Sequence, residues 1–230
     1  SNTHIAYEII VIDNKSTDNS LELIKKQFPD IKLIQNPENY GFSKAINIAA
    51  KKSIGDYLLL LNPDTIVKAN TITKLYESLV SRSEYSVAGA RVLDYDGTFQ
   101  LSSRRAFPDF STSLFHVLGL SYLFPKSKLF GRYNYTFISD KISHEVDSVS
   151  GACMMFSKSL FNNLGGFDED YFLFFEETDF CIRTQKLGKK ILYNSEAEII
   201  HVSYTHIRAP ETREDLGWRL IGEKKNRGGG

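Results

Sequence analysis

Short apolar runs alternate with amphipathic stretches through the first hundred residues of the chain. A continuous apolar run is typical of a strand that is buried on both faces, as in a parallel sheet between helix layers. We therefore expect strands over residues 8–12, 31–35, 57–61 and 87–93. The apolar positions between them recur at helical spacing, which predicts helices over residues 21–28, 42–53 and 69–81. This alternation with short connections predicts an α/β fold with a mostly parallel sheet flanked by helices.

The pattern changes over residues 99–145, where aromatic and basic residues mix without a regular period, apart from a short amphipathic stretch at 114–124. The aromatic residues include Phe107, Phe110, Phe115, Tyr122, Phe124, Phe130, Tyr133, Tyr135 and Phe137, and the basic ones are Arg104, Arg105, Lys126, Lys128 and Arg132. One interpretation is a long irregular connection packed on the core. The other is a binding flap or a membrane-surface patch, because aromatic and basic residues together suit anionic interfaces. The first interpretation is favoured, since aromatic residues usually fill cores.

Regular patterning returns at residue 146. It predicts a strand over 146–156, helices over 157–164 and 176–187, and strands over 190–193 and 197–201. Neither an internal repeat nor a linker interrupts the chain. We therefore expect a single domain over residues 1–208, followed by a charged C-terminal tail over 209–230.

The composition is typical of a soluble globular protein, with 42% hydrophobic and 24% charged residues. Because 28 basic and 28 acidic residues balance, no nucleic-acid partner is expected. Cys153 and Cys181 lie in apolar stretches and are typical of reduced core thiols in a cytoplasmic protein. No apolar run reaches transmembrane length, and no secretory signal is visible.

The apolar run at 57–61 stops abruptly at Asn62, Pro63 and Asp64. Proline has no N–H for a sheet ladder, so the strand must end there. A carboxylate at the C-terminal end of a buried parallel strand lies where open α/β sheets bind ligands. Asp64 is also a hard oxygen ligand of the kind that holds Mg²⁺ or Mn²⁺ against a diphosphate. The alternative is an ordinary turn, since all three residue types favour turns.

Two further polar clusters follow predicted strands near the same edge. Asp13 ends the strand over 8–12 and can accept a hydrogen bond from a pyrimidine ring or a ribose hydroxyl; its alternative is an Asx turn. Gly41 opens the helix over 42–53, with Lys44 and Asn47 close behind, and a helix N-terminus favours phosphate or sugar oxygens. The alternative there is a glycine-containing turn with a capped helix.

Acidic residues concentrate among aromatic ones late in the chain, and they are Asp168, Glu169, Asp170, Glu176, Glu177 and Asp179. Negative charge at a helix start suits the helix dipole, which accounts for one acid but not for six. A base that accepts a proton from a hydroxyl needs a carboxylate beside an apolar wall, and Glu177 or Glu176 fits that role. His201 ends an apolar strand, and we expect either a structural histidine or a second contact to a metal or phosphate.

Six motifs occur in one order, and together they resemble the family 2 glycosyltransferases with the GT-A fold, especially the rhamnosyltransferase-like branch. They are 11–18 (VIDNKSTD), 39–47 (NYGFSKAIN), 59–64 (LLLNPD), 149–152 (VSGA), 165–169 (GGFDE) and 175–183 (FEETDFCIR). The resemblance implies a nucleotide-sugar-binding half over 1–98, the aromatic and basic connection over 99–145, and an acceptor and catalytic half over 146–208.

The resemblance also implies an activity. It is the inverting transfer of a sugar, from a donor such as dTDP-rhamnose or a UDP-sugar, to an acceptor hydroxyl in cell-surface polysaccharide synthesis. The partners would be a nucleotide diphosphate sugar and a glycan or lipid-linked glycan, in the cytoplasm or at the inner face of the membrane. A divalent metal, Mg²⁺ or Mn²⁺, would serve as cofactor.

By the same resemblance, roles fall on particular residues. Donor-binding residues would be Asp13, which contacts the nucleobase, with Asn14, Ser16, Gly41, Lys44, Asn47, Asn62 and Asp64. Asp64 and His201 would hold the metal, and Gly151, Ala152, Asp168 and Glu169 would line the sugar or acceptor site. Glu177 would be the catalytic base, with Glu176 as the substitute, because the family's aspartate is a glutamate here.

The start of the chain departs from the family, which opens with an apolar strand and a helix that precede the strand over 8–12. We expect an N-terminally truncated domain whose exposed sheet edges are available for pairing, including pairing into an oligomer. This departure keeps a second function open, that of a non-catalytic sugar-nucleotide-binding or interaction module. A nucleotidyltransferase is the third reading, although no glycine-rich, basic phosphate loop is visible early in the chain.

Overall fold

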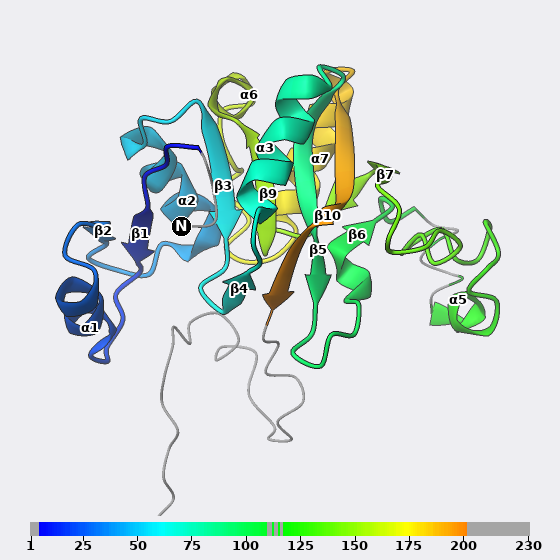
Figure 1. The fold of residues 1–230 in the computed structure, drawn as a ribbon, viewed down its shortest axis with the longest axis horizontal. Helices are drawn as coiled ribbons and strands as arrows, with labels where there is room; N and C mark the ends of the chain where they lie inside the picture. The colour runs from blue at the N-terminus through cyan, green and yellow to red at the C-terminus, as the bar shows by residue number, and fades with distance from the viewer. Residues whose placement is uncertain (1–4, 110–111, 113–114, 116, 202–230) are drawn as a thin grey trace, which may run out of the picture.

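The computed structural model describes residues 5–109, 112, 115 and 117–201. Within them, α-helices and β-strands form one α/β body around a central sheet (Figure 1). The expected tail over 209–230 and the end of the predicted domain over 202–208 lie outside the described residues.

The first strands form a small sheet of their own. β1 (Ile10–Asp13) pairs in parallel with β2 (Lys32–Gln35), and α1 (Ser20–Gln27) connects them. α2 (Gly41–Lys52) packs against β1. Among the described residues, no strand pairs with the second edge of β1. The expectation that a sheet edge is available for pairing with another chain therefore stays a prediction.

The main sheet has the strand order β3-β9-β5-β10-β4, with β7 pairing β10 beside this path. Its strands are β3 (Tyr57–Leu61), β4 (Thr65–Val67), β5 (Tyr85–Leu93), β7 (His144–Val146), β9 (Cys153–Ser157) and β10 (Lys190–His201). The parallel pairing of β5 with β10 is the longest in register. The sheet is nonetheless mixed rather than mostly parallel, because β9 runs antiparallel between β3 and β5. Apolar runs report burial on both faces and not strand direction, so the sequence could not reveal this reversal.

Helices cover both faces of the main sheet. α3 (Thr71–Ser81) packs on β5 and β10 and lies in front in Figure 1. α6 (Lys158–Asn163) and α7 (Glu176–Lys186) contact β9 and β10 from behind. The remaining elements are η1 (Leu101–Ser103), α5 (Leu120–Leu123), and β6 (Arg104–Arg105), which pairs with β8 (Ser148–Val149).

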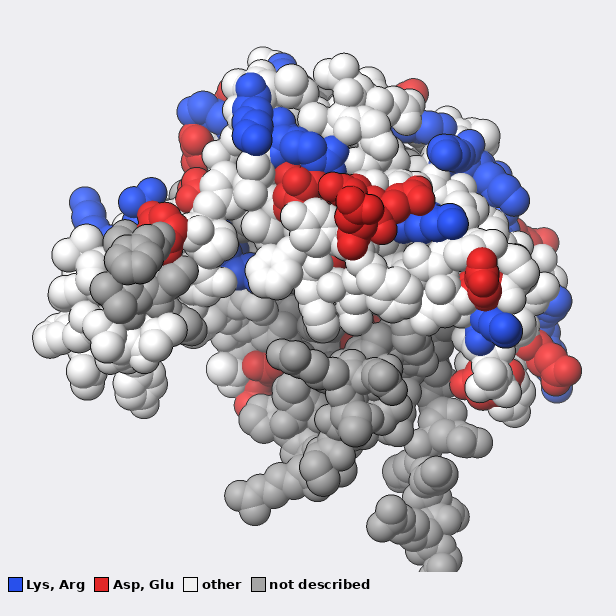
Figure 2. Space-filling view, turned by 180° about the vertical axis from the view of Figure 1, so that it is seen from behind, with Lys and Arg blue, Asp and Glu red and all other residues white. Residues whose placement is uncertain are grey.

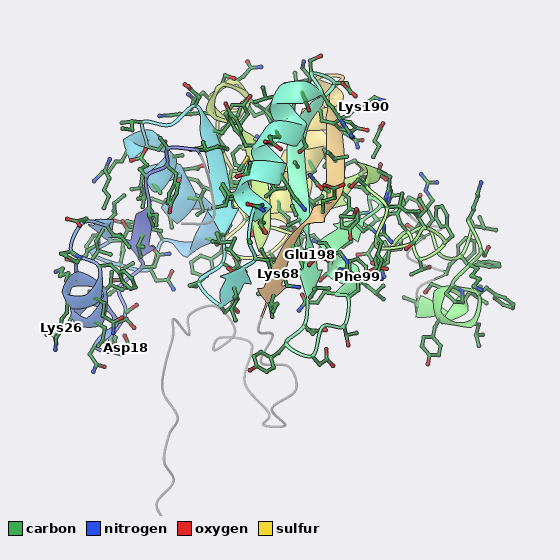
Figure 3. All side chains as sticks on the ribbon, viewed as in Figure 1. Asp18, Lys26, Lys68, Phe99, Lys190 and Glu198 are labelled. Atoms are coloured by element: carbon green, nitrogen blue, oxygen red, sulfur yellow. The ribbon has the colours of Figure 1, made fainter. Side chains whose placement is uncertain are left out.

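β10 is one bent strand where the sequence predicts two. Its register against β5 shifts between Asn194 and Glu198, so the intervening residues leave the ladder. At the shift Glu198 accepts a hydrogen bond from Lys68 at 3.0 Å and pairs with Arg91 (Figure 3). These two cations hold β10 to the strands on both of its sides, which aims the end of β10 at the end of β3.

A buried aromatic cluster fixes the segment that leads into α7. Phe167 is 2% exposed and lies 5.1 Å from Phe180 and 5.6 Å from Phe161, measured between ring centroids. Both cysteines are buried and free, as expected from the sequence. Because Phe167 is anchored in the core, the acidic loop over residues 168–175 starts from a fixed position.

Part of the segment over 99–145 packs on the core, as the favoured interpretation predicts. Phe107 and Tyr135 pack against the core, and Arg104 is 1% exposed and donates to the carbonyl oxygens of Ser139, Tyr135 and Ile138. The interpretation that would place Arg104 in a surface patch is therefore wrong, because its guanidinium group is buried and donates hydrogen bonds to backbone carbonyl oxygens. The predicted helix over 114–124 is described only in part, and α5 is its last turn.

Candidate functional site

Asp64, Asn62 and His201 come together where β3 and β10 end. Asp64 Oδ1 lies 3.2 Å from His201 Nε2, and Asn62 Nδ2 lies 3.5 Å from the same nitrogen. The antiparallel pairing of His201 with Thr65 across β10 and β4 makes this contact possible. Residues that are 137 positions apart in the sequence thus share one end of the sheet.

Gln100 determines how the His201 ring is oriented. Its Nε2 donates to Asp94 Oδ1 at 2.6 Å and to the carbonyl oxygen of His201 at 3.1 Å. Its Oε1, an acceptor only, therefore faces His201 Nδ1 at 3.3 Å, and Nδ1 carries the proton. In the neutral ring, Nε2 then presents a lone pair to the Asp64 carboxylate. Two facing acceptors need a proton or a cation between them, so this pair has the donor chemistry of a metal site.

Asp64 and His201 would supply only part of the coordination shell of a divalent metal. Among the described residues, no group of three or more His, Cys, Asp and Glu side chains gathers at one point. Mg²⁺ and related ions are commonly held by one or two protein side chains, with substrate phosphates and water completing the shell. Asp64 and His201 suit that arrangement, in which a diphosphate would supply further oxygens.

A turn connects this end of β3 to the start of α7. The Asn62 amide donates to the Ala152 carbonyl at 3.1 Å, which holds the 150–152 turn against the predicted metal residues. On the other side of the turn, a side chain at Gly151 would meet Glu177 Cβ at 3.7 Å. Gly151 and Ala152 therefore lie between Asn62 and Glu177, as a shared sugar or acceptor site would require.

The two candidate bases differ in their surroundings. Glu177 is 8% exposed and forms an ion pair with Arg105 of β6. Glu176 is 6% exposed, and its Oε2 is buried with no hydrogen-bond partner in the described part of the chain. Burial raises the pKa of Glu176 to about 7, and the charge of Glu177 adds to the shift. Of the two carboxylates in the first turn of α7, Glu177 thus lies near Gly151 and has a paired cation.

The backbone before α7 is strained. Phe174 and Phe175 adopt left-handed φ values of 68° and 70°, which aromatic residues rarely adopt. Such residues tend to cluster at functional sites, where surrounding structure fixes them. Phe175 also borders a small cleft with Arg105, Tyr133, Ser148 and Thr178. Thr178, which follows Glu177 in the first turn of α7, contributes to the wall of this cleft.

The residues predicted to bind the nucleotide near the end of β1 mainly form hydrogen bonds with one another and with the start of α2. Asp13 is 2% exposed and accepts from the amides of Lys15 and Ser16, which is the Asx turn named above as its alternative. Asn14 Nδ2 donates to the Gly41 carbonyl at 3.0 Å, which ties the end of β1 to the start of α2. These contacts build the loop, and a role for Asp13, Asn14 or Ser16 in donor binding stays a prediction.

The N-terminus of α2 is covered by the acidic loop. The Phe42 amide donates to the Phe172 carbonyl at 2.8 Å, and a Cβ at Gly41 would lie 2.7 Å from that oxygen. Lys44 Nζ stacks 4.1 Å from the centre of the Tyr40 ring. The end of α2 thus positions the segment before α7, and nothing in these contacts tests a donor-binding role for Gly41 or Lys44.

Asn47 and Glu169 meet away from the strand ends. Asn47 Nδ2 donates to the Phe167 carbonyl and to Glu169 Oε1, both at 2.9 Å, and Asn47 Oδ1 accepts from the Phe167 amide. Asp168 accepts from the Asp170 amide within its own turn. The structure therefore brings Asn47 of α2 together with the loop that carries Asp168 and Glu169, whereas a Cβ at Gly151 would meet Glu177 and none of these three. Their predicted roles toward donor or acceptor stay predictions.

Two residues at the site were not predicted from the sequence. Gln100 carried no signal, because an isolated glutamine in an irregular stretch fits any loop. Arg105 was grouped with the basic residues of the 99–145 segment, and only the pairing of β6 with β8 turns it toward α7.

Comparison with known proteins identifies the family. Residues 1–165 match the family described as Glycosyl transferase family 2. This chain belongs to that family. The matched range includes Asn62, Asp64 and the 150–152 turn but ends before α7.

Several characterised proteins resemble the chain. It is 30% identical to "Rhamnosyltransferase WbbL" of Escherichia coli, over 87% of this chain and 74% of that protein. It is 25% identical to "N-acetylglucosaminyl-diphospho-decaprenol L-rhamnosyltransferase" of Mycobacterium tuberculosis, over 84% of this chain and 66% of that one. A third, "Low-salt glycan biosynthesis hexosyltransferase Agl10" of Haloferax volcanii, is 27% identical over 96% of this chain and 66% of its own length. The chain thus spans about two thirds of the length of these last two relatives.

A solved structure, GalNAc-T7 with UDP, GalNAc and Mn²⁺, shares the fold. Its TM-score is 0.61 at 18% identity, over 85% of this chain and 38% of that one. The expected GT-A architecture in a single α/β domain is therefore confirmed at the level of the fold.

Proposed function

We propose that this family 2 member is an inverting glycosyltransferase that moves a sugar from a nucleotide diphosphate sugar to an acceptor hydroxyl. The observation that carries the proposal is the 150–152 turn, which joins Asn62 on one side to Glu177 on the other. The end of β3 that would bind the diphosphate and the Glu177 carboxylate that would act as the base therefore lie on opposite sides of one turn of small residues. An in-line displacement needs that arrangement of leaving group and base.

The residues of this chain divide the reaction between them. Asp64 and His201 would hold the divalent metal, Mg²⁺ or Mn²⁺, which when bound offsets the negative charge that develops on the departing diphosphate. Asn62 supports His201 and fixes the turn through its backbone amide. Glu177 accepts the proton of the acceptor hydroxyl as that oxygen attacks the anomeric carbon from the face opposite the diphosphate. Arg105, which lines the cleft beside Phe175, pairs with Glu177 and would hold its carboxylate in position.

For the substrates, the names of the relatives favour a deoxyhexose or hexose donor, such as dTDP-rhamnose or a UDP-sugar. The mycobacterial relative is named for a diphosphate-linked polyprenol acceptor, and we propose a glycan or lipid-linked glycan acceptor in cell-surface polysaccharide synthesis for this chain. A cytoplasmic location is in keeping with two free buried cysteines.

Calorimetry of donor nucleotides tests the donor half of the proposal. We expect UDP or dTDP to bind in the presence of Mn²⁺ and to lose at least tenfold in affinity with a chelator. Asp64→Ala should remove this metal effect, whereas the control Asp56→Ala, an exposed carboxylate at the opposite end of β3, should retain it. Equal affinity of wild type with and without metal would contradict the role of Asp64. Donor binding without any transfer to an acceptor would favour the non-catalytic binding module instead.

A further inference from the structure

Residues 117–129, which we call the 117–129 protrusion, present an unusual concentration of apolar side chains. Six of the 22 exposed large hydrophobic residues of the described chain lie in it. Their exposed fractions run from 53% to 88%, and they are Val117, Leu118, Tyr122, Leu123, Phe124 and Leu129. Such density over 13 residues exceeds the scatter of single apolar residues that is normal on a protein surface.

The protrusion stands apart from the body of the protein. Figure 1 shows α5 and the turns around it extending from the side of the molecule beyond β6 and β7. From behind, the lower part of this lobe is white, and blue and red side chains lie along its upper edge (Figure 2). Its six apolar side chains are therefore exposed on a part of the molecule that stands away from the central sheet.

Hydrogen bonds and ring contacts within the segment hold the protrusion in shape. Thr136 Oγ1 donates to the Pro125 carbonyl at 2.6 Å, and the Gly131 amide donates to the Ser127 carbonyl at 2.8 Å. The ring of Phe124 packs 5.7 Å from that of Phe130. The exposed apolar residues thus belong to a folded turn that presents them together.

The segment around the protrusion carries positive charge without acidic residues. Residues 110–139 contain Lys126, Lys128 and Arg132 and no aspartate or glutamate, in a chain whose net charge is +0. The two lysines are exposed and lie between Phe124 and Leu129. Basic residues beside aromatic and aliphatic side chains are the chemistry that binds anionic lipid headgroups while apolar groups enter the interface.

We propose that the 117–129 protrusion docks on the surface of an anionic lipid bilayer. Tyr122, Leu123 and Phe124 enter the boundary between headgroups and acyl chains, and Lys126 and Lys128 bind the anionic headgroups. A second copy of this chain fits less well, because a symmetric contact through the protrusion would bring the two basic clusters together. The described residues contain no helix long and apolar enough to cross a bilayer, so this attachment would be peripheral.

The position of the protrusion also relates it to the reaction. It continues from β6, whose Arg105 pairs with Glu177, and the Tyr133 carbonyl, close after the protrusion, accepts from the Ala106 amide. If the proposed transferase function holds, docking would bring the cleft beside Phe175 near an acceptor carried in the same membrane. Lipid binding itself does not depend on that function.

Vesicle co-sedimentation tests the proposal with the full chain. Vesicles of phosphatidylcholine with 30% phosphatidylglycerol would be compared with pure phosphatidylcholine, at ~0.05 M and ~0.5 M salt. We expect binding to the anionic vesicles that weakens at high salt, and little binding to neutral ones. Lys126→Glu and Lys128→Glu should each reduce partitioning by about fivefold or more, because each removes one attractive charge and adds a repulsive one.

The apolar contribution is tested by the double variant Tyr122→Ser with Leu123→Ser, which should reduce partitioning at least tenfold. The matched control is Ile54→Ser with Tyr95→Ser, at 85% and 78% exposure outside the protrusion, and it should bind as wild type does. Urea unfolding of each variant verifies folding without any reference to nucleotide binding, which keeps this result separate from the transferase proposal. Equal binding by wild type and the Tyr122, Leu123 variant, or no binding of wild type to anionic vesicles, would overturn the proposal. So would a dimer in sedimentation velocity that the same variant dissolves, which would make a second copy the occupant.

Discussion

Arg105 and Glu177 form an ion pair between β6 and the first turn of α7, with side chains that are 24% and 11% exposed. The pair joins the aromatic and basic segment to the helix that carries the proposed base. It also connects Glu177, whose Cβ lies close to Gly151, to Arg105 in the wall of the cleft beside Phe175. Glu176, its neighbour, has no such partner in the described part of the chain.

A double-mutant cycle on this pair measures its coupling. Arg105→Ala and Glu177→Gln should each destabilise the fold by about 1–3 kcal/mol, because each leaves the other partner half-buried and unpaired. The double variant should be more stable than the sum of the single effects by about 1–2 kcal/mol. Urea unfolding provides the four free energies. Strict additivity would show that the contact contributes no coupling in solution.

Kinetics separate the two candidate bases. Glu177→Gln should lower kcat by roughly 10²–10⁴-fold while donor affinity stays within about twofold, since general base catalysis contributes that much. Glu176→Gln should retain most of the activity if Glu176 only supports the site. The reverse result would transfer the role of the base to Glu176. Glu145→Gln, an exposed carboxylate paired with Lys190, is the control and should behave as wild type.

The raised pKa of Glu176 predicts how stability depends on pH. In the folded state its pKa lies near 7, above the value of 4.5 for a free glutamate, so the native state binds the proton more tightly than the unfolded state does. This residue therefore lowers the free energy of unfolding as pH rises from about 4.5 to about 7, by on the order of 3 kcal/mol.

Glu176→Gln removes that contribution, because glutamine does not ionise. The variant should gain stability relative to wild type between pH 5 and pH 8, by about 1–3 kcal/mol. Unfolding in urea at the two pH values is the measurement, with Glu145→Gln as a control for surface carboxylates. A stability difference that does not change with pH would show that Glu176 is not desolvated as described.

The Gly165 and Gly166 pair offers a matched test of the Asn47 contact. Both glycines have positive φ, 78° and 85°, so alanine is strained at either position. A Cβ at Gly166 would also lie 2.6 Å from Asn47 Oδ1, whereas a Cβ at Gly165 meets nothing within 4 Å. Gly166→Ala should cost about 1–3 kcal/mol more than Gly165→Ala, measured by thermal or urea unfolding. Equal costs would show that Asn47 moves aside without loss.

The sequence alone determined much of the local structure. Apolar runs and helical spacing located α1, α2, α3 and α7 within two residues of their bounds, because burial on one or two faces leaves a period that a single sequence shows. The six ordered motifs indicated the family that the comparisons confirm. The end of β3 at Leu61 agrees with the prediction from Pro63, which cannot donate to a ladder.

Tertiary structure decided which of these residues meet. β9 reverses direction between β3 and β5, and β10 bends where Glu198 binds Lys68 and Arg91, yet neither strand's direction is encoded in its own apolar pattern. The same holds for Arg105. A basic residue in an irregular stretch suggests a surface position, and Arg105 becomes the partner of Glu177 only through the pairing of β6 with β8. Periodicity reports how a segment is buried, whereas contacts between distant segments depend on strand pairing, which the local pattern of residues does not contain.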